Sequence, residues 1–343
     1  MTLHEATERY LPPLEAALRA ILARTTEDFK PFYGMLQYHQ GWVDESLQPA
    51  TADTGKRVRP ILCLLVCEAC GTRFERAMSL AAALELLHGF SLVHDDIQDR
   101  SPTRRHRRTV WSLWGEAQAI NVGDALLAAA HSALYRQAQA SGPDTALRLA
   151  TALDETCMRL CEGQFLDMDF EKRPVVTVEQ YLGMIERKTA ALLAYSTWSG
   201  AVAGGAADVR AERFEQMGRE LGLAFQVQDD LLGVWGVEAD TGKSASSDIA
   251  SAKKTLPYLY ALATLPRARA VELAALYAQP ARGEAEVERA RQLLDLSQAQ
   301  AMCTDQANRH HERALRRLEE AQPAAAAAGA LLELLARLSG RRH

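Results

Sequence analysis

Two pairs of adjacent aspartates, each set among apolar side chains, are the residues of this sequence best suited to chemistry. Asp95 and Asp96 lie in the segment HDDIQD, and Asp229 and Asp230 lie in FQVQDD. A carboxylate surrounded by Leu, Val and Phe is costly to desolvate unless its charge is compensated. Hard oxygen ligands suit Mg²⁺, which keeps several waters and bridges to substrate phosphates. The two pairs therefore predict a Mg²⁺ site, shared between two helices, that acts on a phosphorylated substrate.

The spacing around both pairs is helical. Residues three, four or seven positions apart share one helix face. In the first segment this rhythm gives a face that runs from polar to strongly acidic: Glu85, His88, Leu92, Asp95, Asp96 and Asp99. In the second segment Gln226, Asp229 and Asp230 form a shorter face of the same kind. Two such faces would repel each other without a cation between them.

Basic segments that suit a diphosphate accompany the acidic pairs. Five arginines fall between Arg100 and Arg108, in an expected loop after the first acidic helix. Three further basic segments are Lys56–Arg59, Arg187–Thr189 and the polar stretch 241–255. The planar arginine fork donates paired hydrogen bonds to phosphate. Five neighbouring arginines would also repel one another without an anion among them, so we expect them to bind one.

Taken together, these motifs resemble those of the trans-isoprenyl diphosphate synthases (polyprenyl synthetases), the family of farnesyl and geranylgeranyl diphosphate synthases. The matches run in order from Gly55 to Pro257 and include TGKRVRP, ELLHGFSLVHDDIQD, NVGDALL, EGQFLD, RKTAALL, FQVQDD and GKSASSDIASAKKTLP. The resemblance implies an all-α fold, with residues 1–343 forming a single-domain helical bundle around a central apolar cavity. It also implies a Mg²⁺-dependent prenyltransferase that condenses isopentenyl diphosphate with an allylic diphosphate.

The resemblance assigns roles to individual residues. Asp95 and Asp99, with Asp96 in support, would bind two Mg²⁺ ions, and Asp229 would bind a third with Asp230 behind it. These aspartates other than Asp230, together with Lys188, are the implied catalytic residues. The residues that match the isopentenyl diphosphate site are Lys56, Arg59, His88 and Arg105. Those that match the allylic diphosphate site are Arg104, Lys188, Thr189, Gln226, Lys243 and Lys253.

Four positions depart from the family pattern. Gly233 stands where the second motif usually has a third aspartate, so the metal site would rely on Asp229 and on Asp240 or Asp248. His106 replaces a glycine in the basic segment after the first motif, where Arg108 also replaces a proline. Ala252 stands where a glycine often precedes the last lysine pair. These changes bear on the fine geometry of the site and leave the reaction class unchanged.

Composition agrees with this interpretation. The chain has 343 residues and a formal net charge of −5, which does not favour nucleic acid as a partner. Alanine and leucine are abundant and β-branched runs are few, so helices should dominate. Thr177 and Gln180 predict a capping box, and the Ala/Leu-rich residues after Pro323 predict a final helix. We expect no transmembrane segment and a cytoplasmic homodimer.

Two other functions use related motifs. A class I terpene cyclase shares the first motif and the fold, but its second motif normally continues with Ser or Thr and then Glu, where this chain has Gly233 and Val237. A cyclase also needs no isopentenyl site. A non-catalytic partner subunit of a heteromeric prenyl synthase tends to lose the aspartate motifs, and this chain keeps both pairs.

Product length should depend on the residues that precede the first aspartate pair. A growing prenyl chain would run along the acidic helix, past the residues one and two turns before Asp95. Ser91 is small, so Phe90 and Leu87 should form the floor, with Leu84 deeper. In the family this pattern is more similar to geranylgeranyl than to bacterial farnesyl diphosphate synthases. We therefore expect a C20 product, with C15 as the second choice.

Overall fold

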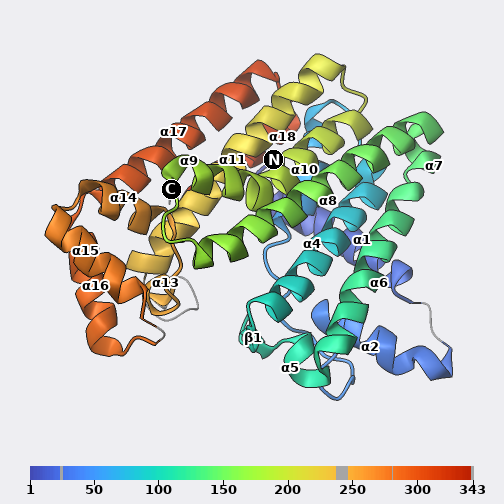
Figure 1. The fold of residues 1–343 in the computed structure, drawn as a ribbon. Helices are drawn as coiled ribbons and strands as arrows, with labels where there is room; N and C mark the ends of the chain where they lie inside the picture. The colour runs from blue at the N-terminus through green and yellow to red at the C-terminus, as the bar shows by residue number, and fades with distance from the viewer. Residues whose placement is uncertain (24–25, 237–245, 280, 341–343) are drawn as a thin grey trace. The chain divides into compact units, whose positions relative to one another are not determined.

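The computed structural model describes residues 1–23, 26–236, 246–279 and 281–340 of the chain (Figure 1). These residues are mainly helical and contain almost no strand, which confirms the predicted all-α fold. By the packing of its backbone, the chain divides into two compact units. Unit 1 contains Met1–Glu155, Tyr195–Glu215 and Ala321–Glu333, and unit 2 contains Thr156–Ala194, Gln216–Glu320 and Leu334–His343. The expectation of one domain over residues 1–343 stays a prediction.

Unit 1 is built around α4, which carries the first aspartate pair. Its elements are α1 (Leu3–Ile21), η1 (Glu27–Phe29), α2 (Lys30–His39), α3 (Val58–Ala69), η2 (Phe74–Ala77), α4 (Met78–Gln98), β1 (Thr103–Arg104), β2 (Arg107–Arg108), α5 (Val110–Trp114), α6 (Glu116–Tyr135) and α7 (Ala138–Ser141). Parts of α8 (Pro143–Lys172), α10 (Ala191–Ala203), α11 (Asp208–Trp235) and α18 (Ala325–Leu338) belong to it as well. Both α1 and α6 pack against α4.

The first half of α4 is buried on every side. The stretch Leu80–Leu87 is below a tenth exposed throughout, and a helix that is apolar all round is a core helix. Together with η2, this helix spans Phe74–Gln98 and is the one described segment long and apolar enough to cross a membrane. Two thirds of its most apolar window, 67%, is buried within the structure. Length and composition alone are therefore weak evidence for a membrane span.

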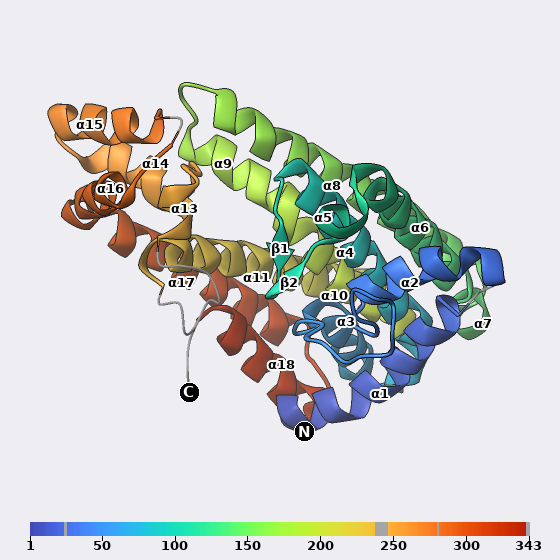
Figure 2. The same cartoon turned by 90° about the horizontal axis from the view of Figure 1, so that it is seen from below.

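The arginine-rich segment after α4 forms a small β-hairpin, where the sequence predicted a loop. Thr103 pairs with Arg108 and Arg104 with Arg107 in an antiparallel ladder (Figure 2). The two turn residues, Arg105 and His106, both have positive φ, at +50° and +60°. Two-residue hairpin turns with positive φ at both positions match the twist of the strands, although glycine or asparagine usually occupies them.

Unit 2 holds the second aspartate pair. Besides its parts of α8, α10, α11 and α18, it contains α9 (Val178–Ile185), the π-helical turn η3 (Glu186–Ala190), α13 (Ser247–Ala250), α14 (Leu256–Thr264), α15 (Arg267–Tyr277), α16 (Glu284–Leu296) and α17 (Ala299–Glu320). Its core gathers apolar side chains such as Met184, Val227, Leu259 and Leu294. The predicted capping box is confirmed at the start of α9, and the predicted final helix is α18.

Candidate active site

In unit 1 the predicted acidic face lies at the end of α4. Asp96 is buried, Asp95 is half-buried and Asp99 is exposed. The Nε of Arg104 donates to Asp96 Oδ1 over 2.8 Å, and its Nη2 donates to Asp95 Oδ2 over 3.3 Å. Burial raises the pKa of Asp96 to about 6, although Arg104 acts in the opposite direction. The hairpin that follows α4 thus provides a cation for its own acidic helix.

The rotation of α4 near Asp95 is fixed by its packing on α6. The ring of His94 lies over Gly123, where an added Cβ would come within 3.1 Å of His94 Cε1 and closer still to other ring atoms. Its Nε2 lies 3.3 Å from the carbonyl oxygen of Ile120 and 3.6 Å from Asp124 Oδ1. The glycine of the NVGD segment is therefore required for the close approach of the two helices beside the aspartate pair.

The residues predicted to bind isopentenyl diphosphate come from three segments of unit 1. Arg59 Nη1 and His88 Nε2 are 3.1 Å apart, the guanidinium of Arg105 packs on Gly55, and the neighbouring Lys56 is exposed. Burial and the nearby arginines lower the pKa of His88 well below its usual range, so the imidazole is neutral. Burial also lowers the pKa of Arg59 to about 10. This cationic cluster is suited to a multiply charged anion.

His39, at the end of α2, belongs to the same cluster and was not predicted. Burial, Arg105 and Arg104 lower the pKa of His39 to about 3. A small hollow of about 30 Å³ joins His39 to Arg104, Arg105 and Asp96. Unit 1 therefore brings the end of the acidic helix and the basic cluster to one place. A periodic pattern could not reveal His39, because a long irregular segment separates it from the GKRVRP motif.

All five clustered arginines have partners within the protein, and the last two contact backbone carbonyl oxygens. Arg107 donates to the carbonyl oxygens of Tyr38 and Val43 over 3.0 and 2.9 Å and lies 3.9 Å from the centre of the Tyr38 ring. Arg108 donates to the carbonyl oxygen of Ser112. These contacts anchor the hairpin to α2 and α5. These carbonyl contacts do not test whether an anion lies among the five arginines, which stays a prediction.

In unit 2 the predicted Lys188 and Thr189 lie on the π-helical turn η3. Single π turns inside helices are rare and often mark functional sites. Lys188 Nζ donates to Asp167 Oδ2 over 2.5 Å, and Thr189 Oγ1 donates to Gln226 Oε1 over 2.7 Å. Gly163 on α8 permits this turn to pack closely, since an added Cβ would lie 2.7 Å from Lys188 Cα. Asp167, the last residue of the EGQFLD motif, was not predicted as a site residue.

The second aspartate pair divides into an exposed and a buried carboxylate. Asp229 is exposed on α11, whereas Asp230 is only 2% exposed. Tyr181 Oη donates to Asp230 Oδ2 over 2.6 Å, and Gln226 Nε2 donates to Asp230 Oδ1 over 3.1 Å. The backbone N–H of Leu256 also donates to Asp230 Oδ2, at the start of α14. Burial raises the pKa of Asp230 to about 7. Asp230 thus connects several elements of unit 2, and its role behind Asp229 stays a prediction.

Gly233, a departure from the family pattern, and Lys254, in the last lysine pair, both have close neighbours in unit 2. The carboxylate of Asp248 lies against Gly233, where an added Cβ would come within 2.5 Å of Asp248 Cγ. Lys254 donates to the carbonyl oxygens of Phe170, Glu171 and Arg173 at the end of α8. A cation on the last carbonyls of a helix compensates its dipole. Asp240 and Lys243 lie outside the described residues, so their predicted roles stay predictions.

The residues predicted to set product length lie on α4 as expected. Leu87 and Phe90 are buried, and Ser91 is half-buried with its hydroxyl donating to the His88 carbonyl. The ring of Phe90 meets that of His94 edge-on, with centroids 4.9 Å apart. Their role in chain length stays a prediction.

The predicted metal ligands do not form a complete metal site by themselves in the part of the chain that the structure describes. Within the described ranges, no three His, Cys, Asp or Glu side chains are grouped as a metal site. The donors at Asp95, Asp99 and Asp229 are all carboxylate oxygens, which suits Mg²⁺. Such donors fit an ion that takes its remaining ligands from water and substrate phosphate, and they do not form a closed protein cage.

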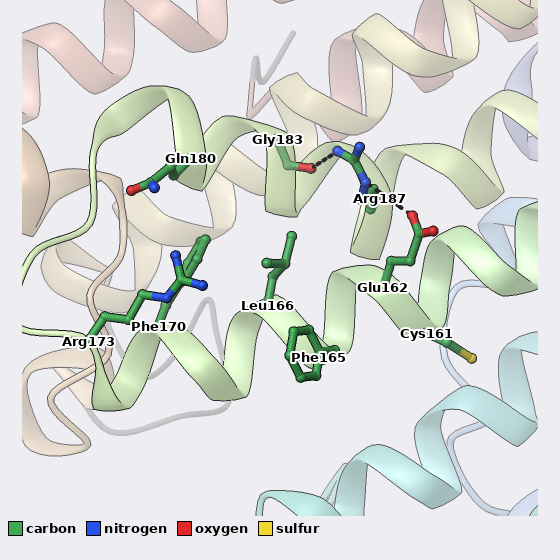
Figure 3. Close-up of a pocket in the computed structure, with 9 residues that line it drawn as sticks. All are labelled: Cys161, Glu162, Phe165, Leu166, Phe170, Arg173, Gln180, Gly183 and Arg187. Atoms are coloured by element: carbon green, nitrogen blue, oxygen red, sulfur yellow. Dashed lines mark hydrogen bonds and ion pairs between the residues drawn. The ribbon is translucent and has the colours of Figure 1, made fainter.

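A separate hollow of about 690 Å³ lies between α8 and α9 in unit 2 (Figure 3). Leu166 and Phe170 point toward α9, whereas Arg187 bridges Glu162 and the carbonyl oxygen of Gly183. Arg187, from a basic segment predicted to suit a diphosphate, is one of the residues that line it, whereas the predicted metal ligands are not among them. Glu162, Phe165 and Leu166 of the EGQFLD motif also line this hollow.

Comparisons with known proteins agree with the arrangement of motifs. The family model described as polyprenyl synthetase matches residues 40–294. A (2E,6E)-farnesyl diphosphate synthase of Mycobacterium tuberculosis is 42% identical over 264 residues, which cover 75% of this chain and 72% of the relative. A geranylgeranyl diphosphate synthase of the same organism is 42% identical over 279 residues, covering 81% and 79%.

Solved structures show the same fold. A polyprenyl synthetase from Streptomyces coelicolor A3(2) superposes with a TM-score of 0.89 at 37% identity, covering 98% of this chain and 99% of its own. A geranylgeranyl pyrophosphate synthetase from Pyrococcus horikoshii does so with a TM-score of 0.86 at 30% identity, covering 99% and 98%. With both aspartate motifs and the basic segments in family order, the chain belongs to the polyprenyl synthetase family of prenyltransferases.

Proposed function

We propose that this protein is a Mg²⁺-dependent chain-elongating synthase that joins isopentenyl diphosphate to an allylic diphosphate and releases a C20 product, geranylgeranyl diphosphate. The C15 product, farnesyl diphosphate, is the second candidate. Similar relatives carry both names, so similarity alone does not choose between them.

One observation carries the proposal. Within unit 1, the acidic end of α4 and a cluster of cationic side chains line the same hollow, which contains Asp96, Arg104 and Arg105. A cyclase acts on one allylic diphosphate and has no use for a second cationic pocket beside its acidic helix. A condensing enzyme must hold two diphosphates, and this cluster supplies the place for one of them.

The two sets of side chains would divide the work. Lys56, Arg59, His88 and Arg105 bind the diphosphate of isopentenyl diphosphate, which remains intact. Lys188, Thr189 and Gln226, with Arg104, Lys243 and Lys253, bind the allylic diphosphate, which departs. Its C–O bond breaks and the electron pair leaves with the diphosphate. The isopentenyl double bond then forms the new C–C bond, and a proton is lost to the released diphosphate.

Metal and cationic side chains would both stabilise the negative charge of the leaving diphosphate. When bound by Asp95, Asp99 and Asp229, Mg²⁺ would neutralise the negative charge that develops on the leaving diphosphate. Lys188 adds a cation whose position is fixed by Asp167. Arg104, which holds Asp95 and Asp96, can exchange a carboxylate for a phosphate oxygen because both accept its paired donors.

The assembly and location of the protein are proposed on lesser evidence. Exposed apolar side chains mark α6 at Ile120 and Tyr135 and α8 at Leu147, Met158 and Phe165. Large exposed apolar side chains commonly mark contacts between proteins, which supports a homodimer. All six cysteines are free thiols, which suits a reducing cytoplasm. Light scattering of the purified protein tests the dimer.

Substrate-specific kinetics test the proposed division of labour. Lys56→Ala and His88→Ala should raise the KM for isopentenyl diphosphate, whereas Lys188→Ala should raise the KM for the allylic primer. Asp95→Ala and Asp229→Ala should lower kcat by orders of magnitude and weaken Mg²⁺ binding in calorimetry with a diphosphate analogue. Equal changes of both KM values in all the basic variants would refute the assignment of two pockets.

A further inference from the structure

Arg57 occupies an unusual place at the start of α3. It lies between Lys56 and Arg59, the two residues assigned to isopentenyl diphosphate, and it is the residue that precedes the helix. Its φ is +46° and its ψ is +38°, a left-handed conformation that costs a non-glycine residue roughly 1–2 kcal/mol. Only 7% of its surface is exposed. Neighbouring interactions must hold both the strained backbone and the buried charge.

A buried carboxylate on α4 supplies one of these interactions. Arg57 Nη1 donates to Glu85 Oε1 over 2.6 Å and to Gln40 Oε1 over 3.0 Å. Glu85 is itself only 6% exposed. Gln40 ends α2, so this one guanidinium joins the beginning of α3 to two other helices. On α1, Glu15 Oε2 lies 3.6 Å from Arg57 Nη2.

One turn further along α4, His88 contacts Arg59. Residues three apart share a helix face, so Glu85 and His88 both contact the segment at the start of α3. Arg57 is held by its ion pair and Arg59 by the 3.1 Å contact with His88. The exposed Lys56 precedes the first of these points. The direction of both diphosphate-binding side chains thus depends on the backbone at Arg57.

Charge gives the pair a second role. Glu85 places a carboxylate inside a cluster that contains Arg59 and Arg105 and that is assigned to an anion. Without Arg57, that carboxylate would repel an incoming diphosphate. Among the described residues, Glu85 Oε2 and Arg59 Nε have no hydrogen-bond partner. Arg59 Nε therefore remains available to donate to a ligand. The free oxygen of Glu85 could accept from the same arginine and so compete with that ligand.

We propose that Arg57 and Glu85 are positioning residues for isopentenyl diphosphate: their ion pair sets the direction of Lys56 and Arg59 and neutralises a carboxylate beside the diphosphate. This inference rests on the proposed pocket assignment. It predicts that breaking the pair affects one substrate and spares the other. A residue that only stabilised the fold would affect both.

Kinetics of Arg57→Met, Glu85→Gln and the double variant Arg57→Met/Glu85→Met test the proposal. Arg57→Met should raise the KM for isopentenyl diphosphate more than about tenfold and change that for the allylic primer less than about threefold. Arg57→Met should raise the KM for isopentenyl diphosphate more than Glu85→Gln does, because it leaves the Glu85 carboxylate without a cation. The double variant should regain thermal stability, since replacing both partners of a buried pair is often neutral. Its KM for isopentenyl diphosphate should stay raised.

A second ion pair on α3 provides a matched control. Arg9 Nη2 lies 2.6 Å from Glu68 Oε1 near the other end of the helix, so Arg9→Met should leave both KM values unchanged. A double variant with a normal KM for isopentenyl diphosphate would overturn the proposal, as would equal changes for both substrates. Calorimetry with isopentenyl diphosphate alone tests the positioning role of Arg57 separately from the proposed synthase activity. Weaker binding in Arg57→Met supports the positioning role even in a protein that forms no product, and unchanged binding overturns it.

Discussion

Replacing Gly163 by alanine should sharply lower kcat/KM for the allylic diphosphate. An added Cβ at Gly163 would lie 2.7 Å from Lys188 Cα and 2.9 Å from the carbonyl carbon of Arg187. Carbon atoms in ordinary contact are about 3.5–4.0 Å apart. Both neighbouring atoms belong to the backbone, so no side chain can rotate away. The π turn that carries Lys188 and Thr189 must move by roughly 1 Å, which is the shortfall in these distances.

The size of the effect follows from this displacement. Overpacking of a core typically costs about 1–3 kcal/mol of folding stability, which a helical protein of this size should survive. A shift of about 1 Å in a positioned group can cost about 100-fold in rate. The shift falls on the 2.5 Å contact of Lys188 with Asp167 and on the contact of Thr189 with Gln226. We therefore expect kcat/KM for the allylic primer to fall about 100-fold.

The assay measures incorporation of labelled isopentenyl diphosphate at varied concentrations of each substrate, beside thermal unfolding. Gly183→Ala is the matched control, because its added Cβ meets only Arg187 Nη1, at an ordinary 3.7 Å. In a helix interior that change should even stabilise the protein by up to about 1 kcal/mol. Normal kinetics in a folded Gly163→Ala variant, or equal effects of both substitutions, would refute the reasoning.

Three further changes have defined outcomes. Gly233→Asp restores the family's carboxylate but collides with Asp248, so steady-state kinetics should show kcat/KM falling about tenfold, and a rise would contradict the structure. His106→Gly relieves a positive φ at an exposed turn residue, so urea unfolding should show a gain of about 1 kcal/mol. The pKa of His39 is lowered to about 3, whereas the unfolded chain binds this proton near pH 6.5. Stability should therefore be full above about pH 6.5 and fall by up to about 1.4 kcal/mol per unit toward pH 3, and His39→Gln should flatten that slope in urea titrations.

The sequence was most informative where a helical period and a charge pattern coincide. The spacing from Glu85 to Asp99 predicted one face of a helix, and α4 has that face. Thr177 and Gln180 predicted a helix start through a local pattern of hydrogen bonds, which the structure contains. Such features depend on residues within one or two turns of each other, so the sequence alone defines them.

Contacts between distant segments could not be predicted in this way. Periodicity placed Glu85 on the acidic face but did not show that its carboxylate forms an ion pair with Arg57. Tyr181 binds Asp230 across 49 positions of the sequence, and no spacing rule connects them. His39 joins the basic cluster from the end of α2. Helical patterns identify the face on which a side chain lies, whereas packing decides its neighbour.

The departures from the family pattern also needed the structure. His106 and Ala252 stand where glycines were expected, and both keep a positive φ, at +60° and +53°. The backbone has therefore retained the conformation that glycine would adopt without strain. The loss of a glycine is visible in the sequence, but the shape of the chain at that position is not.

The most direct test of the proposed function is the length of the product. Purified protein would be incubated with Mg²⁺, labelled isopentenyl diphosphate and, in separate reactions, C5, C10 and C15 allylic diphosphates. We predict elongation that depends on Mg²⁺ and ends at C20, with longer chains from Phe90→Ala because removing the buried ring opens a cavity beside the growing chain. Formation of a cyclic hydrocarbon, or no elongation of any primer, would contradict the assignment as a chain-elongating synthase.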